Sequence, residues 1–458
     1  MELKKYKLAD IAKIEISGVD KKTIEGETPV RLCNFVDVYY NWTITKEKAK
    51  SFMVASAKQT EIDKCSIGKG MVAITKDSET RDDIGIATYI ADDFENVLLG
   101  YHCALITPNP AIVDGKYLNA FMHTRYIQKY FENNASGSGQ RYTLSNDTIS
   151  NIPVLLPSIE EQHTIGKLLA DLDRKIELNE QINDNLEAMS KQLYDYWFVQ
   201  FDFPNEEGKP YKSSGGAMVW NGKLKRKIPN GWTVETVGTY ANCKSGYAIK
   251  SSDFKAKGIP VIKIGNIQED YTLNMNGCQC IENNANKLFY AYQNDVVIAM
   301  TGATIGKFAI VPYSETGYFV NQRVGKFELG NNPIKKMPYL INSLKIDYFR
   351  NQIFQLASGC AQPNISAEQI NNISLLYPST KILSEYNMKC KWMYEQIVNC
   401  RYQIDVLTKL RDELLPLLMN GQASVNYHLS GECCCLDFLF IGDNALFMYS
   451  FILFCLYA

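Results

Sequence analysis

An internal repeat constrains the fold of this chain more than any other feature of its sequence. Residues 117–158 and 339–379 share a series of identical residues in the same order, with one shift of register by a single residue. The matched residues of the first copy are Tyr117, Leu118, Tyr126, Ala135, Ser136, Gly137, Gln140, Ser145, Ile149, Pro157 and Ser158, and those of the second copy are Tyr339, Leu340, Tyr348, Ala357, Ser358, Gly359, Gln362, Ser366, Ile370, Pro378 and Ser379. An ordered series of this kind indicates two copies of one domain.

Upstream of these stretches the match between the copies is looser. Residues 29–35 are echoed by 260–267, and the strand-like stretch 70–75 is echoed by 295–301. A shared frame with divergent loops favours one scaffold that carries two different binding surfaces. An old duplication whose loops drifted without consequence would leave the same pattern, so divergence alone does not decide between these interpretations.

The composition is that of a globular protein with more than one domain. The chain has 458 residues, of which 46% are hydrophobic and 21% are charged. Its formal net charge of −2 is not the strongly basic balance of many nucleic-acid-binding proteins, so DNA binding would depend on local patches. The N-terminal MELKKYKLAD lacks the apolar stretch of a signal peptide, which favours a cytoplasmic location.

Motifs for catalysis and metal binding are missing from the sequence. The 13 cysteines include no two CxxC pairs, and the four histidines lack the spacing of a metal site or a catalytic triad. TGATIGK at 301–307 resembles a P-loop only faintly, because Gly302 and Gly306 lie too close together and Phe308 stands where a magnesium-binding Ser or Thr is needed. We therefore expect no metal site, no bound nucleotide and no catalytic triad on this chain.

A long amphipathic helix is predicted after each copy of the domain. Over 158–200, heptad spacing places two lines of residues on one face: Ile165, Leu172, Asn179, Leu186 and Leu193, and Leu168, Ile182, Met189 and Tyr196. Over 379–421 the corresponding lines are Tyr386, Met393, Cys400, Leu407 and Leu414, and Cys390, Ile397, Ile404 and Leu418. If a pseudo-twofold axis relates the copies, the two helices pair as an antiparallel coiled coil; pairing with another chain is the alternative.

Several motifs together resemble the specificity subunits of Type I restriction–modification enzymes. They are LPSIEEQ…FVQFDFP at 156–204, KIPNGW at 227–232, LRDELLPLLMNGQASV at 410–425, and the turns ASGSGQ at 135–140 and ASGCAQPNIS at 357–366. The resemblance extends from residue 1 to about residue 425. It implies an α/β (α+β) fold with two tandem target-recognition domains, each followed by a long helix of one antiparallel coiled coil.

The expected organisation follows the repeat. It comprises target-recognition domain 1 (1–157), a central spacer helix (158–200), a linker (201–230), target-recognition domain 2 (231–378), a C-terminal spacer helix (379–421) and an apolar, cysteine-rich tail (422–458). The tail departs from the family pattern from residue 426 onward. An out-of-frame or recombined gene end is the favoured interpretation, and a docking tail or a membrane anchor is the alternative.

The resemblance also implies the partners of this chain. Each target-recognition domain would read one half of a split double-stranded DNA site, and the helices would act as a spacer and dock two methyltransferase subunits. Motor-nuclease subunits would complete the complex, and S-adenosylmethionine, ATP and Mg would be bound by these partners, with no role for a membrane. The alternatives are a single chain with its own restriction or methylation activity, and a coiled-coil assembly protein that does not bind DNA.

Candidate DNA contacts are polar and cationic residues at loops and turns of the repeat. In the first domain they are Arg31, Asn34, Ser138, Gln140, Arg141 and Tyr142, and in the second they are Lys263, Asn266, Thr301, Thr304, Lys307, Gln322, Arg323, Gln362 and Asn364. Such side chains are suited to phosphates and base edges. Each also has an ordinary interpretation, because Asn and Gln at turns often cap the backbone and exposed Lys is often only solvated.

Overall fold

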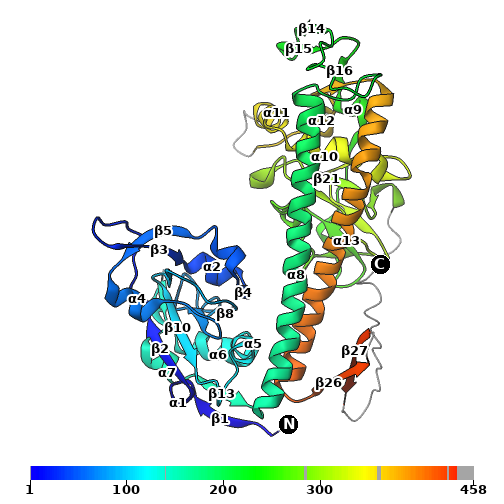
Figure 1. Ribbon diagram of the computed structural model, residues 1–458. Coiled ribbons are helices and arrows are strands. Elements are labelled where there is room, and N and C mark those ends of the chain that lie inside the picture. The colour runs from blue at the N-terminus through cyan, green and yellow to red at the C-terminus, as the bar shows by residue number, and fades with distance from the viewer. Residues whose placement is uncertain (1, 140, 283–285, 358–362, 431–432, 441–458) are drawn as a thin grey trace. The chain divides into compact units, whose positions relative to one another are not determined.

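The computed structural model describes residues 2–139, 141–282, 286–357, 363–430 and 433–440. The chain divides into two compact units, Met1–Glu177 with Val406–Ala458, and Leu178–Asp405. Each unit contains one mixed α/β domain together with a segment of each of the two long helices (Figure 1). We call the first domain D1 and the second domain D2.

D1 is built on short sheets of mixed direction. The largest has the order β2(Ala12–Ile16)-β10(Cys103–Pro108)-β6(Val72–Thr75)-β8(Ala87–Ile90)-β4(Thr43–Ile44). The others are β5(Met53–Ala57)-β3(Thr28–Cys33)-β9(Val97–Leu99), β11(Ser136–Ser138)-β12(Arg141–Thr143)-β7(Asp77–Ser78), and the pair β1(Lys4–Lys7)-β13(Pro153–Leu156). The helices are α1(Leu8–Ile11), α2(Phe35–Tyr40), α3(Lys46–Ala49), α4(Gln59–Cys65), α5(Gly115–Met122), α6(Arg125–Asn134) and α7(Asn146–Ser150).

D2 repeats this frame with different loops. Its sheets are β17(Cys243–Ser245)-β24(Val324–Phe327)-β21(Val296–Ala299)-β22(Phe308–Ile310), β19(Cys280–Ile281)-β18(Ile259–Ile262)-β23(Tyr318–Val320)-β20(Tyr290–Ala291), and the pairs β16(Thr233–Thr236)-β25(Ser374–Tyr377) and β14(Met218–Asn221)-β15(Arg226–Pro229). The α-helices are α9(Val237–Tyr240), α10(Met337–Lys345), α11(Asp347–Ala357) and α12(Ala367–Asn371). Short 3₁₀ turns are η2(Ser251–Asp253), η3(Ile264–Asn266), η4(Lys287–Phe289), η5(Gly302–Thr304) and η6(Pro333–Lys335).

The repeat predicted from the sequence is confirmed by strand pairing. In D1 the parallel pair β3–β9 joins Cys33 to Leu99, and in D2 the parallel pair β18–β23 joins Ile262 to Val320. In each domain an antiparallel pair, β1–β13 or β16–β25, leads the chain into the long helix. The frame is therefore the same at the parallel strand pair and at the helix entry.

A buried tyrosine ties each domain to its helix entry. The hydroxyl of Tyr117 in α5 donates to the carbonyl of Leu155 in β13 at 2.9 Å, and the hydroxyl of Tyr339 in α10 donates to the carbonyl of Leu376 in β25. Both tyrosines are completely buried. Because a buried phenol needs a partner, this bond fixes the strand that immediately precedes the long helix.

The two long helices are α8(Ile159–Tyr194), which ends in the π-turn η1(Asp195–Val199), and α13(Thr380–Met419). Ser158 caps the first of them: its hydroxyl accepts from the backbone N–H of Glu161 at 3.3 Å, and the Glu161 carboxylate accepts from the backbone N–H of Ser158 at 3.1 Å. This reciprocal pair is a capping box and starts the helix directly after Pro157.

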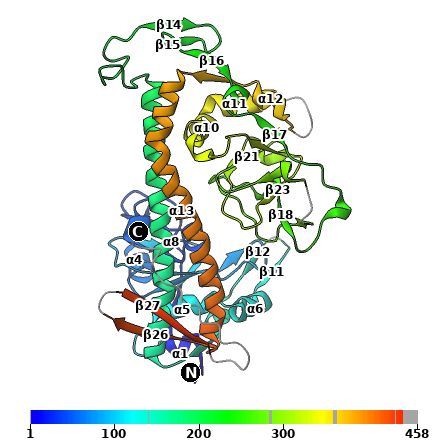
Figure 2. The same ribbon diagram turned by 90° about the vertical axis from the view of Figure 1, so that its right-hand side faces the viewer.

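The predicted antiparallel pairing of the helices is confirmed by side-chain contacts. Within the second unit, Asn179 donates to Gln403 at 3.2 Å, and the hydroxyl of Ser190 donates to the hydroxyl of Tyr394 at 3.4 Å. Residue numbers rise along α8 as they fall along α13, and Figure 2 shows the two helices side by side. In the first unit, Arg411 of α13 lies 3.7 Å from Asp173 of α8.

The second heptad line predicted for α8 is wrong by one residue. Ile182 and Met189 are 44% and 45% exposed, and Tyr196 is also exposed. The buried line is instead Leu169, Ile176, Asn183, Ser190 and Trp197, which alternates with Ile165, Leu172, Asn179 and Leu186 in a regular heptad. The prediction chose Ile182 and Met189 for the helix interface because their side chains are apolar. The structure instead buries Asn183 and Ser190, because polar groups of α10 and α13 face this side of the helix. Of the other predicted pairing positions, Leu193 and Ile404 are half-buried, and Leu168, Met393, Ile397, Cys400, Leu407 and Leu414 are buried.

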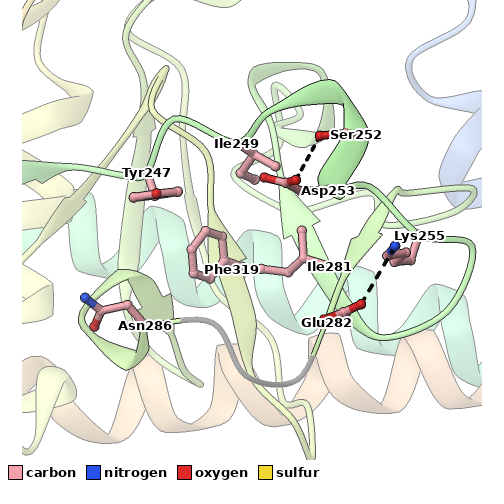
Figure 3. A pocket seen from close by; sticks show the side chains of 9 residues that line it. All are labelled: Tyr247, Ile249, Ser252, Asp253, Lys255, Ile281, Glu282, Asn286 and Phe319. Carbon is pink, nitrogen blue, oxygen red and sulfur yellow. Dashed lines mark hydrogen bonds and ion pairs between the residues drawn. The ribbon is translucent and has the colours of Figure 1, made fainter.

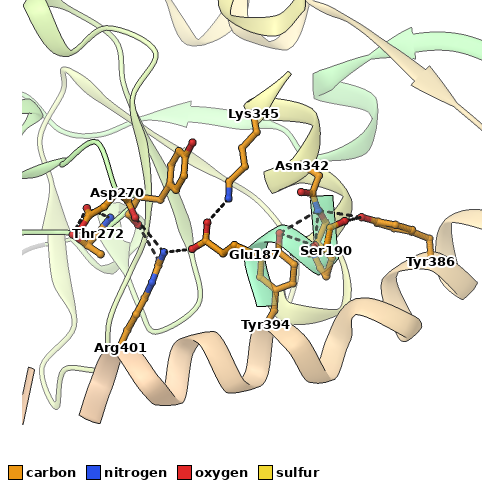
Figure 4. A network of polar contacts seen from close by, with 11 residues as sticks. Glu187, Ser190, Asp270, Thr272, Asn342, Lys345, Tyr386, Tyr394 and Arg401 are labelled. Atoms are coloured by element: carbon orange, nitrogen blue, oxygen red, sulfur yellow. Dashed lines mark hydrogen bonds and ion pairs between the residues drawn. The ribbon is translucent and has the colours of Figure 1, made fainter. Parts of the chain in front are cut away.

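A hydrogen-bond network centred on Asn342 connects α10 to both long helices (Figure 4). The Asn342 amide nitrogen lies within hydrogen-bond distance of Ser190 Oγ at 2.8 Å, Tyr386 OH at 3.0 Å and Tyr394 OH at 3.2 Å. All four side chains are buried. Burial in apolar surroundings makes each of these bonds costly to leave unmade, so the network specifies one register for the three helices.

A second polar group in the same unit is an ion triad around Glu187. The Glu187 carboxylate lies 2.6 Å from Lys345 Nζ and 2.8 Å from an Arg401 guanidinium nitrogen. Arg401 also donates to the carbonyls of Tyr271 and Asp270 at 3.1 and 3.2 Å (Figure 4). Burial lowers the pKa of Lys345, and Glu187 opposes that shift. One carboxylate thus links α8, α10, α13 and a loop of D2.

In the first unit the end of α13 packs on an aromatic stack of D1. The rings of Trp42 and His123 stack with centroids 4.1 Å apart, and the Arg411 guanidinium lies 4.7 Å from the centre of the Trp42 ring. Burial lowers the pKa of His123 to about 4, so the imidazole is neutral and its Nε2–H can donate to the Ala87 carbonyl at 3.0 Å. This stack holds D1 on the helix by cation–π contact.

After α13 the chain forms the antiparallel hairpin β26(Ala423–Ser430)-β27(Cys433–Phe440). The apolar run predicted over 445–458 lies outside the described residues. None of the described helices is both long and apolar enough to cross a bilayer. The interpretation of the tail stays a prediction.

We predict that Glu187→Ala destabilises the second unit more than removal of an exposed ion pair on the same helix. The substitution leaves two largely buried cations without their carboxylate, and we expect a loss of about 2–3 kcal/mol, below the full cost of breaking a buried pair because the groups keep some solvent contact. Equilibrium urea unfolding would measure it. The matched control is Lys191→Ala, which removes the exposed Lys191–Asp195 pair and should cost less than about 1 kcal/mol. Equal losses in the two variants would contradict the role assigned to the triad.

Candidate nucleic-acid interface

Backbone hydrogen bonds show which positions of D1 and D2 are equivalent. Lys76 N–H donates to the His102 carbonyl at 2.8 Å, and Met300 N–H donates to the Arg323 carbonyl at 3.0 Å. Lys76 in turn accepts from Leu144 N–H at 2.8 Å, as Met300 accepts from Ile365 N–H at 2.9 Å. Each domain therefore brings together the end of one central strand, the start of the next and the segment that follows the repeated turn.

In D1 these three segments gather charged side chains around Asp77. Its carboxylate oxygen Oδ2 lies 2.9 Å from Lys76 Nζ, 2.6 Å from His102 Nδ1 and 3.4 Å from Arg141 Nη2. Burial alone would raise the pKa of Asp77, but hydrogen bonds from Thr143, Lys76 and His102 outweigh it and lower the pKa to about 2. Asp77 is thus an ionised, buried anchor, and the cluster presents more positive than negative charge. We call Lys76, Asp77, His102 and Arg141 the Asp77 cluster.

Aromatic rings border the Asp77 cluster. Tyr101 is 44% exposed, and its ring lies 5.3 Å from Lys76 Nζ and edge-on to the His102 ring at 4.2 Å. The Arg81 guanidinium lies 5.0 Å from the centre of the Tyr142 ring. His102 has a left-handed backbone with φ of 76°, which costs a non-glycine residue energy and is often found at functional positions. Cationic groups interleaved with aromatic rings suit a surface that meets nucleic acid.

The structure separates the predicted contacts of D1 into two groups. Arg141 and Tyr142 lie in β12 at the Asp77 cluster, Ser138 lies in the neighbouring strand β11, and Gln140 lies outside the described residues. Arg31 instead donates from Nη1 to the carbonyls of Lys50 and Phe52, both at 3.0 Å. Asn34 is buried and precedes α2, where its backbone N–H donates to Asp37 at 2.7 Å. Arg31 is exposed while it makes these bonds, and the side-chain oxygen of Asn34 has no hydrogen-bond partner among the described residues. The roles of Arg31 and Asn34 as DNA contacts stay predictions.

In D2 the equivalent segments carry different side chains. Thr301 pairs with Asn364 through an isolated bridge, and Gln322 and Arg323 are exposed at the position that Tyr101 and His102 occupy in D1. The hydroxyls of Thr301 and Thr304 are buried with no hydrogen-bond partner within the part of the chain that the structure describes. Lys307 forms an ion pair with Glu269 at 2.9 Å, and Gln362 lies outside the described residues.

The structure also changes the alignment of Asn34 with Asn266. Strand register makes Asn34 equivalent to Lys263, because Lys263 N–H donates to Asn266 Oδ1 at 2.8 Å as Asn34 N–H donates to Asp37. Lys263 stacks 4.0 Å from the centre of the Phe254 ring and contacts Gln279. Asn266 donates to the Asn274 carbonyl at 2.8 Å, so it stabilises a turn. Lys263 and Asn266 therefore have partners within D2.

A pocket on D2 lies beside these residues (Figure 3). Its wall includes Tyr247 and Phe319, and its rim carries the Lys255–Glu282 pair at 3.7 Å. Tyr247 also accepts from the backbone N–H of Gln322 at 2.9 Å, which connects the pocket to the candidate surface. The described residues contain no group of three or more His, Cys, Asp and Glu side chains that could hold a metal ion.

Sequence reasoning missed four residues of the D1 surface: Lys76, Arg81, Tyr101 and His102. One signal in the sequence could have found two of them. Gln322 and Arg323 were predicted in D2, and projecting them through the repeat leads to Tyr101 and His102. The looser match upstream of the repeated turn hid that correspondence, because the strands that carry it share few identities between the copies.

Comparison with known proteins agrees with this arrangement. The model of the Type I restriction modification DNA specificity domain matches residues 1–188 and 229–385. The chain is 25% identical over 328 residues to the MjaIX specificity subunit of a Type I restriction enzyme of Methanocaldococcus jannaschii, covering 70% of this chain and 71% of the relative. It is 24% identical over 398 residues to the HindI specificity subunit of Haemophilus influenzae, covering 75% and 85%.

A solved structure shares the fold. The S subunit of a Type I restriction–modification system from M. genitalium superposes with a TM-score of 0.57 at 16% identity, covering 91% of this chain and 96% of that chain. The family model matches most of this chain, once over each of the two repeats that the sequence and the strand pairing define. The chain therefore belongs to the Type I restriction–modification DNA specificity family, as a specificity subunit with two tandem recognition domains.

Proposed function

We propose that this chain reads a bipartite double-stranded DNA target and directs adenine methylation and ATP-dependent cleavage by its partner subunits. One observation carries the proposal: two copies of one frame present different side chains at equivalent positions. D1 offers Asp77, Tyr101 and His102 where D2 offers Thr301, Gln322 and Arg323. Two domains with the same fold but different hydrogen-bonding side chains are suited to bind two different half-sites. The reason is that bases are distinguished by the pattern of donors and acceptors on their edges.

The chain would work without catalytic groups of its own. Two methyltransferase subunits would supply S-adenosylmethionine-dependent methylation, and motor-nuclease subunits would supply ATP- and Mg-dependent cleavage. The complex would act on DNA in the cytoplasm. The names of the relatives as specificity subunits support this division of labour.

The antiparallel helix pair would set the spacing of the two half-sites. Coiled helices resist bending and compression, so readers attached to the pair would meet the duplex at a preferred separation. Half-sites about one turn of B-DNA apart, roughly 34–36 Å, face the same side of the duplex. A split motif with an unspecified spacer follows from this arrangement.

We predict a split methylation motif when the chain is co-expressed with its methyltransferase partner. Methylated adenines would be mapped by sequencing, and two short specified blocks separated by several unspecified base pairs are expected. The chain purified alone with S-adenosylmethionine is the control and should leave DNA unmodified. A continuous palindrome, or modification by the chain alone, would refute the proposal. A partner complex that assembles but shifts no DNA would support the coiled-coil assembly alternative.

We predict that exchanging residues 231–378 for the second domain of a relative changes one half of that motif only. The reason is that D2 has its own sheets and its own buried clusters. Methylome mapping of the chimera measures the outcome, with an exchange of residues 1–157 as the matched control that should change the other half. Simultaneous change of both halves would show that the domains do not read independently.

We predict that inserting seven residues into both long helices, at paired positions near Asn179 and Gln403, lengthens the spacer of the motif. One heptad keeps the seam in register and adds at most about 10 Å of helix. That corresponds to no more than about three base pairs of duplex. The same insertion in one helix alone should abolish methylation. A spacer that stays unchanged after the paired insertion would contradict the role of the helices.

A further inference from the structure

We propose that Arg141, positioned by Asp77, reads a guanine in the half-site bound by D1. This inference rests on the proposed function and assigns a base to one position of the target. It draws on the Asp77 cluster, on the hairpin that carries Arg141 and on the contrast with D2.

Asp77 holds one end of the Arg141 guanidinium in place. Asp77 is largely buried, and its Oδ2 lies 3.4 Å from Arg141 Nη2. His102 Nδ1 lies 2.6 Å from the same guanidinium nitrogen. Lys76 shares the carboxylate, so Asp77 does not cancel the positive charge of the cluster. A buried carboxylate that fixes an arginine reduces the rotamer freedom that the arginine would lose on binding DNA.

Arg141 remains accessible while it is held. Its side chain is 59% exposed, against 9% for Asp77. The hydrogen bond to Asp77 uses one N–H of Nη2, so the other N–H of Nη2 and those of Nη1 and Nε remain for a base. Asp77 cannot reach a base itself, because its side chain is 9% exposed and is in contact with Lys76, His102 and Arg141. The group offered to DNA is therefore the arginine.

The hairpin β11–β12 gives Arg141 a suitable platform (Figure 2). Arg141 is the first residue of β12, paired with Ser138 of β11, and β12 pairs in turn with β7 at Asp77. Gly137 has φ of 152°, and a side chain there would collide with the Arg141 carbonyl, so this position requires glycine. A two-stranded ribbon fits the major groove of B-DNA, where an arginine at its tip meets base edges.

Guanine is the base that matches such an arginine. Its N7 and O6 are two adjacent acceptors in the major groove, and they pair with two N–H donors of one guanidinium. Adenine offers one acceptor beside a donor, cytosine offers a donor, and thymine offers one acceptor beside a methyl group. An arginine fixed by a carboxylate therefore selects guanine over the other three bases.

D2 differs at the position of the anchor. Thr301 stands where D1 has Asp77, and Arg323 stands where D1 has His102. Threonine cannot act as an anionic anchor for an arginine. The guanine read by a carboxylate-fixed arginine is therefore assigned to the half-site of D1.

The test uses the full chain with its methyltransferase partner, and compares Arg141→Gln with the wild type by methylome mapping. The D1 half-site is identified by the exchange of residues 1–157. In wild type it should contain an invariant guanine. In Arg141→Gln that single position should lose at least tenfold in preference, on the order of what one bidentate arginine supplies, while the other half stays unchanged. Arg125→Gln, an exposed arginine of D1 outside the cluster, is the matched control and should leave the motif intact.

Two further variants separate the roles within the cluster. Arg141→Lys keeps the charge but loses the fork, so it should also lose the guanine preference. Asp77→Asn should relax the same position less strongly, because the arginine remains but is no longer fixed. Competition binding with duplexes that differ only at that base pair measures the preference for every variant that binds DNA.

The outcomes distinguish the inference from the function on which it rests. If wild type shows a split motif with no guanine in the D1 half, or if Arg141→Gln leaves the motif unchanged, the guanine assignment is overturned and the proposed function stands. If Arg141→Gln or Arg141→Lys weakens binding uniformly for all sequences, Arg141 contacts a phosphate and the assignment is also overturned. Absence of any split motif in wild type would instead refute the proposed function.

Discussion

The bond between a buried tyrosine and a strand carbonyl is the interaction on which the arrangement of each recognition domain depends. Tyr117 and Tyr339 each donate to the last strand before a long helix, at Leu155 and Leu376. A phenol that is fully buried cannot lose its partner without a desolvation cost of about 1–3 kcal/mol. Both copies therefore retain a contact that holds the last strand of the domain where the long helix begins.

The two copies cap the helix that carries this tyrosine in different ways. In D1, Asp114 caps α5 by accepting from Tyr117 N–H at 2.9 Å, and Gly166 of α8 leaves room for it, since a side chain there would lie 2.8 Å from the Asp114 carboxylate. In D2, Asn387 of α13 itself accepts from Tyr339 N–H at 3.0 Å. Gly166 of α8 thus makes room for the cap of α5 in D1, and Asn387 of α13 supplies the cap of the equivalent helix α10 in D2. The contacts that join domain to helix are specific to each copy, although the frame is shared.

The extent to which the sequence predicted this structure depended on how each feature is encoded. The repeat and the long helices follow from spacing, because heptads and ordered identities are local patterns. The antiparallel pairing needed the further assumption of a pseudo-twofold axis, and pairing with another chain was the alternative. The second line of the α8 seam could not be predicted, since Asn183 and Ser190 are buried beside polar groups such as Asn342 that lie far away in the sequence. The hydrogen bonds of Arg31 could not be predicted for the same reason, because the carbonyls of Lys50 and Phe52 become its neighbours only in the folded sheet.

The Asp77 cluster could not be predicted from local sequence patterns either, because Lys76, His102 and Arg141 come together only through strand pairing. Its composition nevertheless explains how a chain with a net charge of −2 can present a surface for DNA. Acidic residues on such a surface would repel phosphates if they were exposed. Here the acid is buried and shared by three cationic or titratable groups, so its charge orients Lys76, His102 and Arg141 while the exposed Arg141 presents positive charge to solvent.

In D2, Arg323 is exposed and Lys307 is paired with the exposed Glu269. The balance of charge at the two surfaces is therefore unequal, and bulk charge, which averages over both, is a poor guide to either.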